Sequence, residues 1–162
     1  MLMISHRGNI EGPTPELENT QPYLDKAIKD GYDVEADCWF LYNQWWLGHD
    51  EPKHKITLNW IDKNKWSLWL HCKNVEALCE FSKNYSNLSI SSPNYFWHQN
   101  DDVTLTSHNW LWTFPNKKLT SQSVCVLPEL GYDEGIKKCY GICTDYVLEY
   151  KINRHLIQVG LY

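Results

Sequence analysis

Apolar and polar residues alternate most clearly over residues 32–40, where Val34, Ala36 and Cys38 interleave with acidic residues. Successive side chains of a strand point to opposite faces, so the pattern predicts a strand with one apolar and one acidic face. The acidic face of a half-buried strand usually contacts water, but inside a barrel it can line a functional mouth.

Short apolar runs of similar length predict further strands along the chain. Most are separated by loops rich in Asn, Ser, Pro and Lys that are too short for full helices. The predicted strands cover residues 1–5, 32–40, 45–48, 66–72, 94–98, 103–107, 110–114, 124–127 and 139–144.

Two helices are predicted between these strands. One begins at the N-cap residue Thr20 and ends at Gly31, and the other covers residues 75–81 with its apolar side chains at helical spacing. Residues 146–162 fit either a closing helix or an edge segment.

About eight strands with intermittent helices predict an α/β fold, a compact (β/α)8 TIM-type barrel with several helices shortened or replaced by loops. Such barrels typically have about 250 residues. This chain has 162 residues, which is the main internal argument against the barrel. No repeat, low-complexity tract or linker interrupts the sequence, so residues 1–162 are predicted to form a single domain.

Composition excludes several partners. The chain is 43% apolar and carries nine Trp and ten Tyr, enough to build a core from a short sequence. Its net charge is -5 and it has no basic run, so neither nucleic acid nor a polybasic membrane contact is expected. No apolar stretch nears the roughly 20 residues of a membrane-spanning helix. Composition does not identify the substrate, and a small molecule is expected from the polar motifs that follow.

The six cysteines lie in apolar segments without a CxxC pair, so we expect reduced, mostly buried thiols rather than a zinc site. Residues 1–5 are too short for a signal peptide. Both features predict a cytoplasmic protein.

Five polar motifs follow predicted strands, at or just after their ends. They combine histidines, carboxylates, an arginine and a lysine, a mixture suited to holding a divalent cation and a phosphate while protons move. The motifs are His6-Arg7-Gly8, Glu35-Ala36-Asp37, His49-Asp50, His71-Cys72-Lys73 and the segment Gly141-Ile142-Cys143-Thr144-Asp145.

These motifs resemble the glycerophosphodiester phosphodiesterase family, within the wider group of phosphatidylinositol-phospholipase-C-like phosphodiesterases. The matching segments also include Glu18-Asn19-Thr20, which we interpret as loop and helix-cap architecture rather than chemistry, and residues 31–37 and 140–146. The first fifty residues match most specifically. The resemblance implies a (β/α)8 barrel that hydrolyses phosphodiesters with a divalent cation, usually Mg2+ or Ca2+.

By the same resemblance, His6 and His49 are the general acid and base, Arg7 grips the phosphate, and Glu35 and Asp37 ligate the metal. The chemistry of these residues agrees: carboxylates hold a cation, guanidinium forms a bidentate fork with phosphate, and imidazole exchanges protons near neutral pH. Which histidine is the acid and which the base stays open.

His71 departs from the family pattern, which has an acidic residue, one spacer and then lysine. Lys73 fits as a phosphate contact, whereas His71 puts an imidazole where a third anionic ligand is expected. Imidazole favours Mn2+ or Zn2+ over Mg2+ or Ca2+, so one interpretation is that the metal preference has shifted toward a transition metal. The alternatives are that His71 binds the metal weakly or only through water, or that it makes a structural hydrogen bond to a carboxylate. His98 and Trp112 end strand-like runs and are candidates for lining the substrate pocket, with core packing as the alternative.

Three functions remain open at this point. The first is a metal-dependent phosphodiesterase that acts on glycerophosphodiesters or related compounds. The second is a catalytically inactive barrel that binds a phosphorylated ligand or partner, favoured by the short chain and by His71. The third is a hydrolase of other phosphoesters that uses a transition metal.

Overall fold

The computed structural model of the chain describes residues 1–85, 92–131 and 135–158, the last five of these as backbone only. The first half contains β1 (Leu2–His6), α1 (Gln21–Lys29), β2 (Asp33–Leu41), β3 (Gln44–Leu47), β4 (His54–Ile56), α2 (Leu58–Asn64), β5 (Leu68–Cys72) and α3 (Val75–Tyr85). The second half contains β6 (Asn94–Phe96), β7 (Val103–Leu105), β8 (Leu111–Thr113), β9 (Ser123–Val126), the 3₁₀ turns η1 (Pro128–Leu130) and η2 (Ile136–Lys138), β10 (Gly141–Thr144) and α4 (Val147–Gln158).

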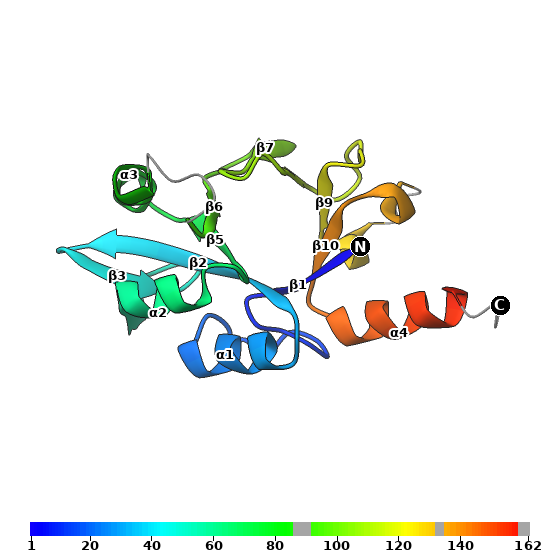
Figure 1. Cartoon of the computed structure of the whole chain (residues 1–162), viewed down its shortest axis with the longest axis horizontal. Helices are drawn as coiled ribbons and strands as arrows, with labels where there is room; N and C mark the ends of the chain where they lie inside the picture. Colours follow the sequence, from blue (N-terminus) through cyan, green and yellow to red (C-terminus); the bar gives the residue numbers. More distant parts are fainter. Residues whose placement is uncertain (86–91, 132–134, 159–162) are drawn as a thin grey trace.

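The ten strands form one mixed sheet that curls into an open half-barrel (Figure 1). Seven strands run parallel in the order β6-β5-β2-β1-β10-β9-β8. The strand β7 pairs antiparallel with β8, and β3 and β4 extend antiparallel from the distal half of β2. The described residues show no strand pairing between β6 and β7, so the sheet stays open there, and Ser107, just after β7, makes a single backbone hydrogen bond to Tyr95 O of β6 at 2.9 Å.

The predicted (β/α)8 TIM-type barrel is therefore wrong. That fold needs a helix after each parallel strand, whereas the described part of the chain has four α-helices, after β1, β4, β5 and β10. Hairpins take the place of several crossover helices. The β2–β3 hairpin turns at Tyr42 and Asn43, both with positive φ, as a tight two-residue turn requires.

The local predictions agree better with the structure. The helix α1 ends before Gly31, which adopts φ 86°. Of the segment 146–162, residues 147–158 form the helix α4, and the last four lie outside the described residues. The strand β4 and the helix α2 were not predicted. Thr57 caps α2 by accepting a hydrogen bond from the backbone N–H of Trp60 at 3.1 Å.

The two faces of the curled sheet contact different parts of the molecule. Val34, Ala36 and Cys38 point outward into the main core, where they pack beneath the helices that lie outside the curl (Figure 1). The alternate residues of β2 point inward, as the alternation predicted. Inside the curl, a second apolar cluster is built from Ile4, Trp69, Phe96, Trp112, Val124, Val126 and Cys143.

The six cysteines, all within the described residues, form no disulfide, and five are buried, as predicted. Across the described residues, no helix combines the length and apolar character that crossing a bilayer requires.

Candidate metal and phosphate site

Strand register brings His6, His71 and the two predicted carboxylates together, the histidines at the carboxyl ends of β1 and β5 and the carboxylates in the first half of β2. His6 is the register partner of Glu35, and His71 is the register partner of Asp37. Glu35 and Asp37 are two residues apart and point to the same inward face. Four side chains from three neighbouring strands thus face one interior space.

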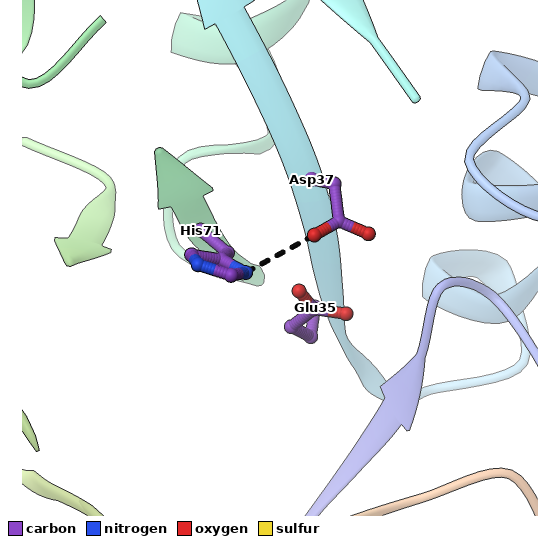
Figure 2. Close-up of side chains that lie close together, drawn as sticks. All are labelled: Glu35, Asp37 and His71. Atoms are coloured by element: carbon purple, nitrogen blue, oxygen red, sulfur yellow. Dashed lines mark hydrogen bonds and ion pairs between the residues drawn. The ribbon is translucent and has the colours of Figure 1, made fainter. Parts of the chain in front are cut away.

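Glu35, Asp37 and His71 could together hold a metal ion (Figure 2). One ligand atom from each residue lies within 4.8 Å of the other two. The three residues are only 3%, 1% and 8% exposed, so their ligand atoms are largely withdrawn from water. Two carboxylates and one imidazole are a donor set that fits a divalent cation of the first transition row as well as Mg2+ or Ca2+.

Asp37 is surrounded by donors and cations. Its carboxylate accepts a hydrogen bond from Asn19 Nδ2 at 2.9 Å, and its Oδ1 lies 3.1 Å from His71 Nδ1 and 3.4 Å from Lys73 Nζ. Arg7 Nε lies 3.2 Å from Oδ2. Although burial alone would raise it, the pKa of Asp37 is held far below its ordinary value by His71, Arg7 and Lys73. These contacts favour the anionic form of Asp37.

Glu35 has much less compensation than Asp37. Among the described residues, its carboxylate accepts one hydrogen bond, from the backbone N–H of Arg7 at 3.3 Å, and lies 3.9 Å from His6 Nε2. Burial, and next the charge of Asp37, raise the pKa of Glu35 above its ordinary value. A cation bound beside both carboxylates would compensate the charge of Glu35.

His6 is held from the opposite side by a residue from another part of the sequence. Asp145, directly after β10, places its Oδ1 2.8 Å from His6 Nδ1. Burial opposes protonation, but Asp145 and then Glu35 raise the pKa of His6 above its ordinary value. The bond to Asp145 orients the ring so that Nε2 is the nitrogen on the Glu35 side.

Arg7 is fixed by a strained loop. Its backbone is left-handed, with φ 52°, and Gly8 follows with φ 93°. The guanidinium bridges two carboxylates, since Nη1 donates to Glu18 at 3.2 Å while Nε faces Asp37. Burial lowers the pKa of Arg7, but Asp37 and Glu35 more than reverse this and raise it, so the guanidinium stays charged.

These side chains open onto a cavity of about 370 Å³ at the same edge of the sheet. All nine residues predicted as site residues line it: His6, Arg7, Glu35, Asp37, His49, His71, Lys73, His98 and Trp112. The cavity is within the usual size of small-ligand sites.

Three of the nine lie outside the buried cluster of charged side chains. His49 is 42% exposed and bonds to the exposed Asp50 at 2.7 Å, beyond the buried cluster. His98 stacks on the His71 ring with centroids 4.3 Å apart, and burial together with His71 lowers the pKa of His98 to about 4. Trp112 is 2% exposed and belongs to the interior apolar cluster, so it forms the floor of the cavity.

Sequence reasoning gave Asn19 only a loop and helix-cap role, placed Asp145 in a motif without a role of its own, and did not single out Asn9. Asn19 is 2% exposed, and its side-chain amide bonds to both the carboxylate and the backbone N–H of Asp37. Asn9 Nδ2 donates to Glu18 at 2.9 Å and to Asp145 at 2.8 Å. Asp145 had a usable signal, because it directly follows the strand-like run 139–144. Asn19 lay in a matching segment that was interpreted as loop architecture, and Asn9 had no signal, because the contacts of both residues depend on loop conformation.

Comparisons of this chain with protein-family models, with curated proteins and with solved structures found no match.

Proposed function

We propose that this protein is a metal-dependent phosphoric diester hydrolase that acts on glycerophosphodiesters or related small phosphodiesters. One observation carries the proposal. Two histidines, an arginine and a lysine line the same cavity as a buried set of two carboxylates and an imidazole. Anion-binding, proton-exchanging and cation-holding groups are then all within reach of one bound phosphodiester.

Glu35, Asp37 and His71 would hold the divalent cation, which would neutralise a non-bridging phosphate oxygen and stabilise the charge that grows in the transition state. The identity of the metal depends on His71, whose imidazole favours Mn2+ or Zn2+ over Mg2+ or Ca2+.

Arg7 and Lys73 are placed to bind the remaining phosphate oxygens. Both face Asp37, at 3.2 Å and 3.4 Å, from the cavity wall. A cation at Asp37 would compete with both side chains for that carboxylate, leaving their charges available to a phosphate. Guanidinium offers two parallel donors and ammonium a point charge, so together they would fix the orientation of the diester.

His6 and His49 would divide the proton transfers. The carboxylate of Asp145 fixes Nδ1 of His6 and supports its protonated form, which suits donation of a proton to the leaving alcohol from Nε2. His49 is exposed at the rim and would accept the proton of the attacking hydroxyl. If the substrate carries a vicinal hydroxyl, that group can attack first and form a cyclic phosphate.

The test is hydrolysis of bis(p-nitrophenyl) phosphate and of glycerophosphocholine with Mg2+, Ca2+, Mn2+ or Zn2+. We expect turnover with at least one metal. His6→Ala and His49→Ala should each reduce kcat by at least about 100-fold, the scale of positioned acid–base catalysis. His54→Ala is the matched control, because His54 lies on β4 and does not line the cavity. Near-normal rates in either of the first two variants would reject the assignment.

Metal binding can be tested separately by calorimetry. Glu35→Gln should weaken cation affinity at least about tenfold, because it removes one anionic ligand. Glu51→Gln is the control, since Glu51 is exposed and pairs with Lys53 at 3.6 Å. Unchanged affinity in Glu35→Gln would show that the cation binds elsewhere.

A second candidate function is binding of a phosphorylated ligand without turnover. The observation that favours it is the ion pairing of Asp37 with Arg7, His71 and Lys73, which compensates this carboxylate without a metal. Retained binding of glycerol 3-phosphate in calorimetry, combined with no turnover under any metal, would favour it. In either case, reduced thiols are the basis for proposing a cytoplasmic location.

A further inference from the structure

A second cavity opens at the opposite edge of the sheet. It measures about 560 Å³, and its lining includes residues at the amino-terminal ends of β1, β2, β5 and β6. The interior apolar cluster separates the two cavities. Trp69 lines the second cavity and Trp112 lines the first, and their rings pack against each other with centroids 5.8 Å apart. The second cavity is thus a distinct site.

Asn94, the first residue of β6, is a buried donor without a partner in this cavity. The residue is 4% exposed. Its Oδ1 accepts hydrogen bonds from the backbone N–H of His108 at 3.2 Å and from Ser107 Oγ at 3.3 Å. A backbone N–H is always a donor, so this contact fixes the orientation of the amide. The buried Nδ2 is left with no hydrogen-bond partner among the described residues, which is costly unless a ligand or water accepts from it.

Asp33, the first residue of β2, supplies an acceptor to the same cavity. Its Oδ2 accepts a hydrogen bond from Trp69 Nε1 at 2.9 Å. Within the described residues Oδ1 has no hydrogen-bond partner, so it is available to a ligand donor. Trp69 is also the register partner of Asn94, so the indole lies on the strand between the acceptor and the donor. Asn94 lies level with Glu35, two strand spacings from β2 and two residues beyond Asp33, so the backbones of Asp33 and Asn94 are about 12 Å apart.

Aromatic rings complete the cavity. Trp110 and Tyr140 stack with centroids 3.5 Å apart and both line it. Trp66, which also lines it, is 64% exposed, an unusual position for so large an apolar ring. The cavity thus combines flat apolar faces with one fixed donor and one fixed acceptor.

The charges and spacing restrict the ligand class. Asp33 disfavours an anion. A cation would meet the Asn94 donor and the ammonium of Lys65, which lies 5.2 Å from the Trp66 ring centroid. A hydroxyl can donate to Asp33, and another can accept from Asn94. Hydroxyls on opposite sides of a pyranose ring lie farther apart than neighbouring groups on one edge of a nucleobase, so they suit the wide spacing of Asp33 and Asn94. The apolar C–H face of a pyranose also fits against an exposed indole.

We propose that this cavity binds a neutral sugar ring, a hexopyranoside, whose hydroxyls bridge Asp33 and Asn94 while its C–H face packs on Trp66. This proposal does not depend on the phosphodiesterase proposal, since the two cavities share no lining residue.

The experiment measures binding of the methyl glycosides of glucose, galactose, mannose and N-acetylglucosamine to the full chain. Saturation-transfer NMR and tryptophan fluorescence report on binding at millimolar ligand. We expect at least one glycoside to bind, and both Asp33→Asn and Trp66→Ala to weaken it at least about tenfold. Trp66 is exposed, so its variant should fold even if changes at the buried Asn94 do not.

Two controls separate the sites. Tyr42→Ala removes an aromatic ring that is 97% exposed and lies outside the cavity, and His6→Ala alters only the metal and phosphate site. Both variants should bind the glycoside with wild-type affinity. The proposal would be overturned if none of the four glycosides binds, or if Trp66→Ala and Asp33→Asn bind the glycoside with wild-type affinity. Tighter binding of uridine, adenosine or choline than of any glycoside would also overturn it.

Discussion

Replacing Asn19 by alanine tests whether this asparagine holds the anionic centre of the site in place. Asn19 Nδ2 donates to Asp37 Oδ2 at 2.9 Å, and Asn19 Oδ1 accepts from the backbone N–H of Asp37 at the same distance. Both bonds are buried. The alanine variant therefore removes one donor from a charged carboxylate and leaves one buried N–H without its acceptor.

The expected loss can be worked out bond by bond. A hydrogen bond to a charged group contributes about 1.5–3 kcal/mol, and an unsatisfied buried N–H costs about 1–3 kcal/mol. Arg7, His71 and Lys73 still compensate Asp37 in the variant, so the lower ends of both ranges apply. We expect the amide contacts to account for about 2–3 kcal/mol of the free energy of unfolding.

Backbone strain must be subtracted from the measured value. Asn19 has φ 57°, a left-handed conformation that costs alanine about 1–2 kcal/mol. Asn43 is the matched control: it has φ 59°, is exposed, and its side chain makes no hydrogen bond with the described residues. Asn43→Ala should therefore lose only the backbone term.

Urea denaturation of the two variants measures the difference, with two-state behaviour checked by two probes. Asn19→Gly and Asn43→Gly repeat the comparison without left-handed strain and should differ by the same amount. In calorimetry, Asn19→Gly should also weaken cation binding roughly 10- to 100-fold, the usual effect of losing a partner that orients a metal ligand. Equal losses of stability in the Asn19 and Asn43 variants would show that Asn19 does not hold Asp37 in place.

Three further predictions concern other parts of the site. His71→Glu should shift metal preference toward Mg2+ or Ca2+ in calorimetry, and an unaltered metal profile would count against His71 as a ligand. Asp145→Asn should lower the pKa of His6, measured by NMR in metal-free buffer. A raised pKa of His6 in the folded state stabilises the fold at pH values below the unfolded pKa of about 6.5. The Asp145→Asn variant should therefore lose more stability at pH 5.5 than at pH 9. Gly48→Ala should cost about 2 kcal/mol or more in urea denaturation, because Gly48 has φ 143° and a Cβ would collide with a nearby carbonyl oxygen. Gly31→Ala, at φ 86° with open space around it, should cost less.

The sequence was informative where a local period decides the outcome. Two-residue alternation in β2 separates outward Val34 and Ala36 from inward Glu35 and Asp37, and the structure has this arrangement. Strand ends were readable as well, so all nine predicted site residues line one cavity. Their chemical roles stay predictions, because no comparison bears on them.

The sequence did not show whether the sheet closes into a barrel or stays open, because this depends on whether a helix or a hairpin follows each strand. A left-handed pair such as Tyr42 and Asn43 turns the chain back as a hairpin, and apolar runs of three or four residues look the same in hairpins and in barrels. The strand β4 was missed for a related reason: its three residues include one buried side chain, Ile56, and no repeated alternation.

The open sheet also explains why loops, rather than neighbouring helices, support the site. In the short parallel array, the segments after β1 and β10 lie at adjacent strand ends, because β1 and β10 pair in register from Leu2 with Gly141 to Ser5 with Thr144. Asp145 therefore reaches His6 although the two are 139 residues apart in sequence. The loop before α1 supplies Asn19 to Asp37 in the same way. A buried group of like-charged carboxylates is stable only when such partners come from several directions, so these loops are under as strong a structural constraint as the strands.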